Sequence, residues 1–72
     1  MAHAFRKGQK VTWTWGDATA HGKIDERFER RVSRTIKGTR VTRVGTAENP
    51  AYLIKQDDGG KVLKRGSELR SR

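Results

Sequence analysis

Apolar and polar residues alternate with a period of two near the start of the chain. The segment "KVTWTW", Lys10 to Trp15, places its polar residues on one side and three apolar residues on the other: Val11, Trp13 and Trp15. This period is typical of a β-strand with one buried face. Gly16-Asp17 then predicts a turn, after which "TAHGKI" resumes an extended pattern.

A second pair of strands is predicted near the end of the chain. The apolar runs "AYLIKQ" and "KVLK" flank Asp57-Asp58-Gly59-Gly60, and Asp and Gly tolerate the positive φ angles that tight hairpin turns need. Pro50 has no N–H to donate to a sheet, so "GTAENP" is interpreted as a connecting loop. Leu69, the only apolar residue of "RGSELRSR", is expected to close one end of the core.

The middle of the chain fits either a helix or strands. Its apolar residues lie four apart, a spacing that suits one face of both: Ile24, Phe28, Val32 and Ile36. Asp25-Glu26 and Lys37-Gly38 resemble the two ends of a helix. The segment "RVSRTIKGTRVTRV", however, is dense in β-branched residues, which favour strands. Residue preferences alone leave both structures open.

The composition is polar for a folded protein. Apolar residues make up 32% of the 72 residues and charged residues 35%, whereas about 25% charged is typical of globular domains. Low hydrophobicity with high net charge is also a signature of disorder. The alternation, the aromatic residues and the glycine-rich turns nevertheless predict one folded domain, residues 5–70. Its core should hold only about a dozen apolar side chains.

No segment predicts a disulfide, a thiolate metal site or a membrane span. Cysteine is absent, and no apolar run approaches the roughly 18 residues that a membrane helix needs. The N-terminal "MAHAFRKGQK" lacks the apolar stretch of a signal peptide. We therefore expect a cytoplasmic monomer without a cofactor.

The segments "FRKGQKVTWTWG", "GKI" and "RTIKGTRVTRVGTAENPAYLIKQDDGGKVLKRGSEL" resemble the hypervirulence-associated protein TUDOR-like domain family. The resemblance runs from about Phe5 to Leu69, is weaker across "DERFERRV", and is most specific in "RTIKGTRVTRVGTAENPAYLI". It implies an all-β fold, a small SH3-like (Tudor-like) five-stranded barrel, and so favours strands in the middle of the chain. The family brings no established reaction or ligand, so the resemblance leaves the function open.

Two interpretations of the tryptophans follow from a barrel. Both can be core residues, since each aromatic side chain buries on the order of 200 Å². Alternatively, the strand bends after Trp13, so that Trp15 lies at the barrel mouth beside Tyr52. The peptide-binding surface would then consist of Trp13, Trp15 and Tyr52. Resemblance to Tudor barrels implies the possibility of an aromatic cage that holds a methylated ammonium group by cation–π attraction. Further candidates for such a cage are Phe28 as an aromatic and Asp17 or Glu26 as an acid.

The charge is concentrated in the middle of the chain. Of a net charge of +9, most lies in a segment with Glu29 as its only acid and seven basic residues: Arg27, Arg30, Arg31, Arg34, Lys37, Arg40 and Arg43. If the segment is a hairpin that turns near Lys37-Gly38-Thr39, one side of its first arm presents Arg31, Ser33, Thr35 and Lys37. Arg40 and Thr42 then line the second arm.

Arginines interleaved with hydroxyl residues suit phosphate, because guanidinium groups make bidentate contacts and hydroxyls add short hydrogen bonds. The sequence therefore predicts a nucleic-acid contact at these seven residues. Lys61, Lys64 and Arg65 are expected to lie apart from it, on the last hairpin. Two other interpretations stay open: another polyanion or acidic protein as the partner, and a solvated surface whose charge only maintains solubility.

Little in the sequence predicts catalysis. His3 and His21 stand alone, the second in an expected turn, and Asp57-Asp58 precede Gly-Gly, where aspartate is explained by the turn itself. No glycine cluster has the spacing of a phosphate-cradling loop before a helix. We expect a small non-enzymatic binding module, with nucleic acid as its partner or, alternatively, an acidic or methylated peptide.

Overall fold

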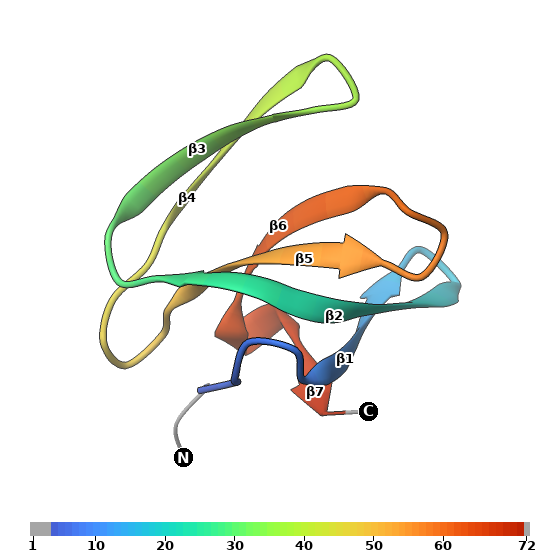
Figure 1. The fold of residues 1–72 in the computed structure, drawn as a ribbon, viewed down its shortest axis with the longest axis horizontal. Coiled ribbons are helices and arrows are strands. Elements are labelled where there is room, and N and C mark those ends of the chain that lie inside the picture. Colours follow the sequence, from blue (N-terminus) through green and yellow to red (C-terminus); the bar gives the residue numbers. More distant parts are fainter. Residues whose placement is uncertain (1–3, 72) are drawn as a thin grey trace.

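The computed structural model describes residues 4–71, which form an all-β structure with one turn of 3-10 helix (Figure 1). Its strands are β1 (Lys10–Trp15), β2 (Ala18–Phe28), β3 (Arg31–Ile36), β4 (Thr39–Val44), β5 (Ala51–Gln56), β6 (Lys61–Arg65) and β7 (Arg70–Ser71). The 3-10 turn η1 (Gly66–Glu68) lies between β6 and β7. The all-β prediction is confirmed, and the middle of the chain forms strands rather than a helix.

The strands are divided between two antiparallel sheets. Five of them form one sheet in the order β6-β5-β2-β1-β7, while β3 and β4 pair only with each other. Figure 1 shows this β3–β4 hairpin leaving the sheet after β2 and returning before β5. The prediction of one five-stranded barrel therefore needs correction. The described residues form a five-stranded sheet plus a separate hairpin, and they do not close into a barrel because the hairpin has no ladder to the sheet.

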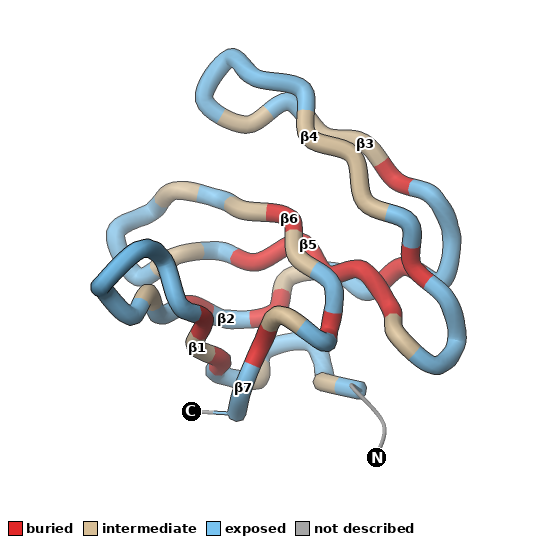
Figure 2. Tube along the Cα trace, turned by 180° about the vertical axis from the view of Figure 1, so that it is seen from behind, coloured by how far each residue is buried: buried red, intermediate tan, exposed pale blue. Residues whose placement is uncertain are grey.

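Strand β5 is the centre of the core, because four successive residues of it are buried: Ala51, Tyr52, Leu53 and Ile54. One face of the sheet packs around Tyr52 and Ile54, together with Val11, Trp13, Ile24 and Leu69. The other face packs around Ala51 and Leu53, together with Phe28, Val32 and Leu63. Figure 2 shows the buried positions gathered in the sheet and at the hairpin's base, with the hairpin tip exposed. The burial of Leu69 confirms its predicted place in the core.

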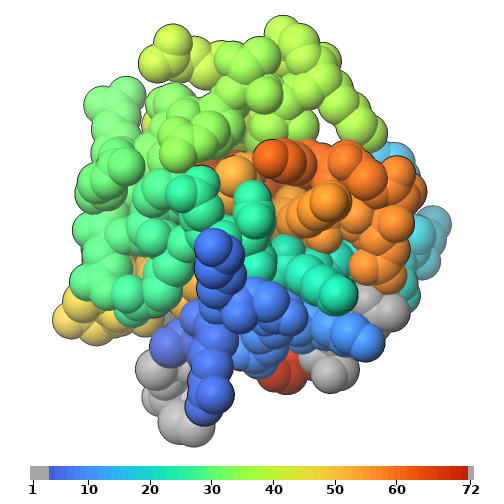
Figure 3. All heavy atoms as spheres, in the orientation of Figure 1, coloured from blue at the N-terminus to red at the C-terminus, as the bar shows by residue number. Residues whose placement is uncertain are grey.

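The β3–β4 hairpin covers the second of these faces. Ile36 and Val41 pack against the cluster that contains Val32, so the apolar residues on one side of the hairpin face the sheet. In Figure 3 the side chains of the hairpin lie against those of β5 and β6. At the base of the hairpin, Gly45 lies so close to the backbone of β2 that an added Cβ would be 2.3 Å from the carbonyl oxygen of Phe28. A side chain there would push the hairpin away from the sheet.

The turn of the hairpin lies where the sequence predicts it. Lys37 and Gly38 connect β3 to β4 with φ angles of 51° and 77°, the left-handed conformation that two-residue hairpin turns favour. The register pairs Ser33 with Thr42 and Thr35 with Arg40. Since directly opposed residues share a face, the predicted polar side of the hairpin is confirmed, and it points away from the core.

Candidate nucleic-acid interface

The seven predicted basic residues do not form a single surface. The register of the hairpin places Arg31 and Arg40 on its outer face, whereas Arg34 and Arg43 share the inner face with Val32 and Val41. Arg27 is the residue before the last of β2, opposite Tyr52, and Lys37 occupies the hairpin turn. The structure therefore brings these residues into one region but divides them between two faces.

The inner-face arginines are held by partners from other elements. The Arg34 guanidinium lies 5.0 Å from the ring centroid of Phe28, and its Nη2 is 3.9 Å from an oxygen of Glu26. The Nε of Arg43 is 3.6 Å from Oε1 of Glu68, in the 3-10 turn. A cation over an aromatic face and an ion pair both favour the folded state modestly. These two arginines attach the hairpin to the sheet.

Two more arginines of the group are engaged near the junction of β2 and β3. Arg27 pairs with Glu29, and its hydrogen bonds to Tyr52 and Glu29 raise the pKa of its guanidinium above the ordinary value. The Arg30 guanidinium lies 5.2 Å from the centroid of the Phe28 ring and donates to the carbonyl oxygen of Arg31 at 3.2 Å. Both guanidinium groups therefore already interact with other groups of the protein.

The remaining three, Arg31, Lys37 and Arg40, form no ion pair with the residues that the structure describes. Arg31 and Arg40 flank the hydroxyls of Ser33 and Thr42, which are 2.8 Å apart and hydrogen-bonded to each other. One hydroxyl of such a pair keeps its own hydrogen free for an external acceptor. Beside them, a shallow depression of about 180 Å³ is lined by Ser33, Arg34, Thr35 and Arg40. We call the surface formed by Arg31, Ser33, Thr35, Arg40 and Thr42 the outer hairpin face; Arg34 lines the depression from the inner face.

The three predicted aromatic residues occupy different environments. Trp13 is 4% exposed and Tyr52 is fully buried, whereas Trp15 is 71% exposed. The hydroxyl of Tyr52 accepts the backbone N–H of Phe5 at 2.8 Å, and the Phe5 ring packs edge-on against it. The expectation that Tyr52 stands beside Trp15 at the surface is wrong, because β5 is covered on both faces. Trp13 is a core residue, and Trp15 is the exposed one.

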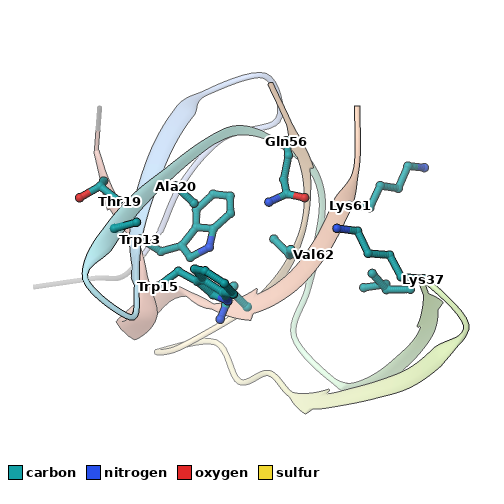
Figure 4. Close-up of a pocket in the computed structure, with 11 residues that line it drawn as sticks. Trp13, Trp15, Thr19, Ala20, Lys37, Gln56, Lys61 and Val62 are labelled. Carbon is teal, nitrogen blue, oxygen red and sulfur yellow. The ribbon is translucent and has the colours of Figure 1, made fainter. Parts of the chain in front are cut away.

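Trp15 borders a partly open cavity of about 370 Å³ between the ends of β1 and β6 and the hairpin turn. Figure 4 shows Trp13 and Trp15 on one side of it and Lys37 and Lys61 on the other. Lys64 also lines it. Sequence reasoning missed Lys61 and Lys64 by assigning them to a hairpin apart from the other basic residues. The sequence shows that these residues are positively charged. It does not show that β6 lies near the hairpin turn, because that depends on the tertiary structure.

A second basic surface lies on the sheet. The register places Lys10 opposite Lys23, Lys23 opposite Lys55, and Lys55 opposite Lys61. These four lysines form a row across four neighbouring strands, and all four are exposed. Directly opposed like charges destabilise a sheet. We call this arrangement the lysine row. The pattern along the chain does not reveal it, because the four residues come from separate segments.

The model of the family described as "Hypervirulence associated proteins TUDOR domain" matches residues 8–69. The chain belongs to this family. No curated protein and no solved structure gives a significant match. Membership in a family of small all-β Tudor-like domains identifies the chain as a small binding module.

This TUDOR domain does not assemble the aromatic cage that the resemblance made possible. Tyr52 and Phe28 are buried in the core, and Glu26 pairs with Arg34. The cavity beside Trp15 is lined by three lysines and, among the described residues, by no acidic side chain. A methylated ammonium group would meet repulsion there, so the electrostatics of the cavity favour an anionic ligand.

Groups that could support catalysis or metal binding are scattered. Within residues 4–71 no three His, Cys, Asp or Glu side chains come together in a way that could hold a metal ion. His21 is exposed on β2 rather than in the expected turn, and His3 lies outside the described residues. Asp58 accepts the N–H of Gly60 at 2.9 Å, which is a turn contact. Over the same range, no helix has the length and apolar character needed to cross a membrane.

Proposed function

We propose that this TUDOR domain binds nucleic acid by its phosphate groups, with the outer hairpin face as the contact surface. The observation that carries the proposal is the division of the arginines. Four arginines of the cluster have partners within the protein, whereas Arg31 and Arg40 point outward and pair with no carboxylate of residues 4–71. An arginine that stabilises the fold needs an internal partner, so unpaired outward arginines are available for an external anion.

The chemistry of the surface suits phosphate. Guanidinium groups bind phosphate oxygens in a bidentate manner, and a hydroxyl adds a directional hydrogen bond. Ser33, Thr35 and Thr42 supply hydroxyls on the same face as the two arginines. The net charge of +9 adds a long-range attraction toward polyanions that speeds encounter. Contacts to the phosphates of a nucleic acid do not distinguish one base from another, so we expect weak preference for particular base sequences.

The alternative proposed from the sequence, an acidic or methylated peptide docked on a Trp/Tyr surface, has less support. Trp13 and Tyr52 are buried, which leaves only Trp15 of that surface, and three lysines line the cavity next to Trp15. An acidic peptide still fits the positive charge. It therefore enters the experiment as a competing ligand, represented by oligoglutamate.

The test compares salt dependence between two double variants. Amide chemical shifts locate the residues that contact short duplex and single-stranded DNA. The dissociation constant for each is measured at increasing salt concentrations, starting at about 50 mM. Arg31→Gln with Arg40→Gln removes two contacts, so the log–log salt slope should become shallower by about 1.5 units. Lys10→Gln with Lys23→Gln removes the same charge from the lysine row and serves as the matched control. The control should keep the wild-type slope to within about half a unit.

Two results would contradict the proposal. Equal weakening by both double variants would mean that net charge, rather than the outer hairpin face, drives binding. Absence of shifts with any nucleic acid, combined with binding of oligoglutamate, would replace the proposed partner with an acidic protein.

A further inference from the structure

The most exposed large apolar side chain of the described residues is an indole that borders a cationic cavity. Trp15 is 71% exposed, compared with 4% for Trp13 on the same side of β1. Tryptophan buries its surface in most folded proteins, because its large ring contributes strongly to stability when covered. An indole left open beside a cavity is therefore a surface that a ligand can cover.

The lining of the cavity determines the charge of that ligand. Lys37, Lys61 and Lys64 line it, and no acidic residue does so within the described chain. The amino group of Lys61 is 4.0 Å from Asp25, and that of Lys64 is 3.8 Å from Glu68. The Lys61–Asp25 pair is exposed, whereas the Lys64–Glu68 pair is partly buried. Exposed pairs contribute little, so an anion can compete most readily for Lys61. Lys37 forms no ion pair within the described part of the chain, and Figure 4 shows it extending from the hairpin turn toward Val62.

We propose that the cavity binds one unpaired nucleobase, stacked on Trp15, while the neighbouring phosphates contact Lys37, Lys61 and Lys64. The proposal rests on the proposed function and specifies its ligand class as single-stranded nucleic acid. A flat aromatic ring and an adjacent anion are the two parts of a nucleotide, and the cavity offers an aromatic surface and adjacent cations. Platforms of this type bind single strands with little sequence preference.

Duplex DNA cannot use the platform in the same way. Its bases are stacked on each other, so a base reaches Trp15 only after leaving the stack, which costs free energy. A single strand presents unpaired bases without that cost. The outer hairpin face and the cavity meet at Lys37, in the turn between β3 and β4. One strand can therefore pass from the arginines of the hairpin to the indole.

The polar group at the upper edge of the cavity in Figure 4 is the amide of Gln56. Its Oε1 is buried and has no hydrogen-bond partner among the described residues. Buried polar atoms usually have partners. Rotation of this amide would present a donor or an acceptor to the edge of a stacked base, and either group would serve any of the bases.

The experiment separates stacking from phosphate contact by changing the protein and the ligand independently. Wild type, Trp15→Ala and Trp15→Phe are titrated with oligothymidylate, with a strand of equal length that lacks its bases, and with a duplex. Quenching of indole fluorescence and the upfield shifts of thymine protons report stacking. Because Trp15 is exposed, Trp15→Ala should remain folded, which the amide spectrum verifies.

Trp15→Ala should weaken oligothymidylate binding by roughly 5- to 100-fold. It should leave the duplex affinity, the affinity for the baseless strand and the salt slope unchanged. Trp15→Phe should retain most of the affinity, because any aromatic ring can stack. Wild type should bind the baseless strand as weakly as Trp15→Ala binds oligothymidylate.

Two results would overturn the inference alone. They are an unchanged oligothymidylate affinity in Trp15→Ala, and equal weakening toward the duplex and the single strand. In both cases binding that still depends on Arg31 and Arg40 would leave the proposed function intact. Failure of the wild type to bind any nucleic acid would instead remove both.

Discussion

Trp13 and Trp15 lie two residues apart on the same side of β1, yet their exposed fractions are 4% and 71%. Trp13 lies opposite Ala20 and packs in the cluster with Tyr52 and Ile54. β7 pairs with β1 only at Val11 and Thr12. Trp15, the last residue of β1, lies beyond this pairing. One side chain therefore belongs to the core, and the other lies where the sheet ends.

This difference predicts unequal effects on stability. Trp13→Ala should lower the free energy of unfolding by roughly 3–5 kcal/mol, because it leaves a large cavity in a small core. A domain of this size has a total stability of only about 5 kcal/mol, so the variant should be largely unfolded. Trp15→Ala should cost less than about 1 kcal/mol. Urea denaturation followed by circular dichroism measures both; equal losses would show that Trp15 is also a core residue.

The division of the arginines predicts that Arg34 and Arg31 differ as well. Arg34→Gln should lower the free energy of unfolding by about 0.5–1.5 kcal/mol, since it removes a cation from the Phe28 ring and an ion pair to Glu26. Arg31→Gln should change it by no more than about 0.5 kcal/mol. Thermal and urea unfolding of the two variants test this. Equal stabilities would mean that the inner-face contacts do not hold the hairpin.

The lysine row predicts a stabilising substitution. Lys23 lies between Lys10 and Lys55 on neighbouring strands, so Lys23→Gln should raise the free energy of unfolding by about 0.2–1 kcal/mol. The gain should shrink as salt screens the repulsion. Lys7→Gln, which removes the same charge from the turn before β1, is the control and should leave stability nearly unchanged. A loss of stability in Lys23→Gln would contradict the prediction.

The base of the hairpin predicts a strongly destabilising substitution. In Gly45→Ala the new Cβ would lie 2.3 Å from the carbonyl oxygen of Phe28 and 2.5 Å from the backbone nitrogen of Ala51. Backbone atoms cannot yield as a flexible side chain can, so we expect a loss of about 3 kcal/mol or more. Amide exchange in β3 and β4 should accelerate first. Ala47→Ser, in the same loop, is the control; wild-type exchange in Gly45→Ala would show that the loop adapts.

Much of the local structure followed from the sequence. The alternation in "KVTWTW" put Val11, Trp13 and Trp15 on one face, and the β-branched residues after Arg31, with the family resemblance, indicated strands. Lys37-Gly38 located the hairpin turn, and the period of two then determined which residues form the outer hairpin face. These features depend on residues that are close together in the sequence, so the pattern of residues along the chain predicts them.

The tertiary structure decided which of these residues have partners. Tyr52 is buried because residues from β1, from β2 and from both ends of the chain's described part pack around it, while the hairpin covers Ala51 and Leu53 on the other face of β5. The pattern of a single strand does not show that both of its faces are covered. Arg43 is paired because Glu68, from a distant segment, reaches it. Lys61 and Lys64 reach the cavity of Trp15 because β6 runs past the hairpin turn. Ion pairing and burial depend on what lies across space, so only the folded chain separates a structural arginine from one available to a ligand.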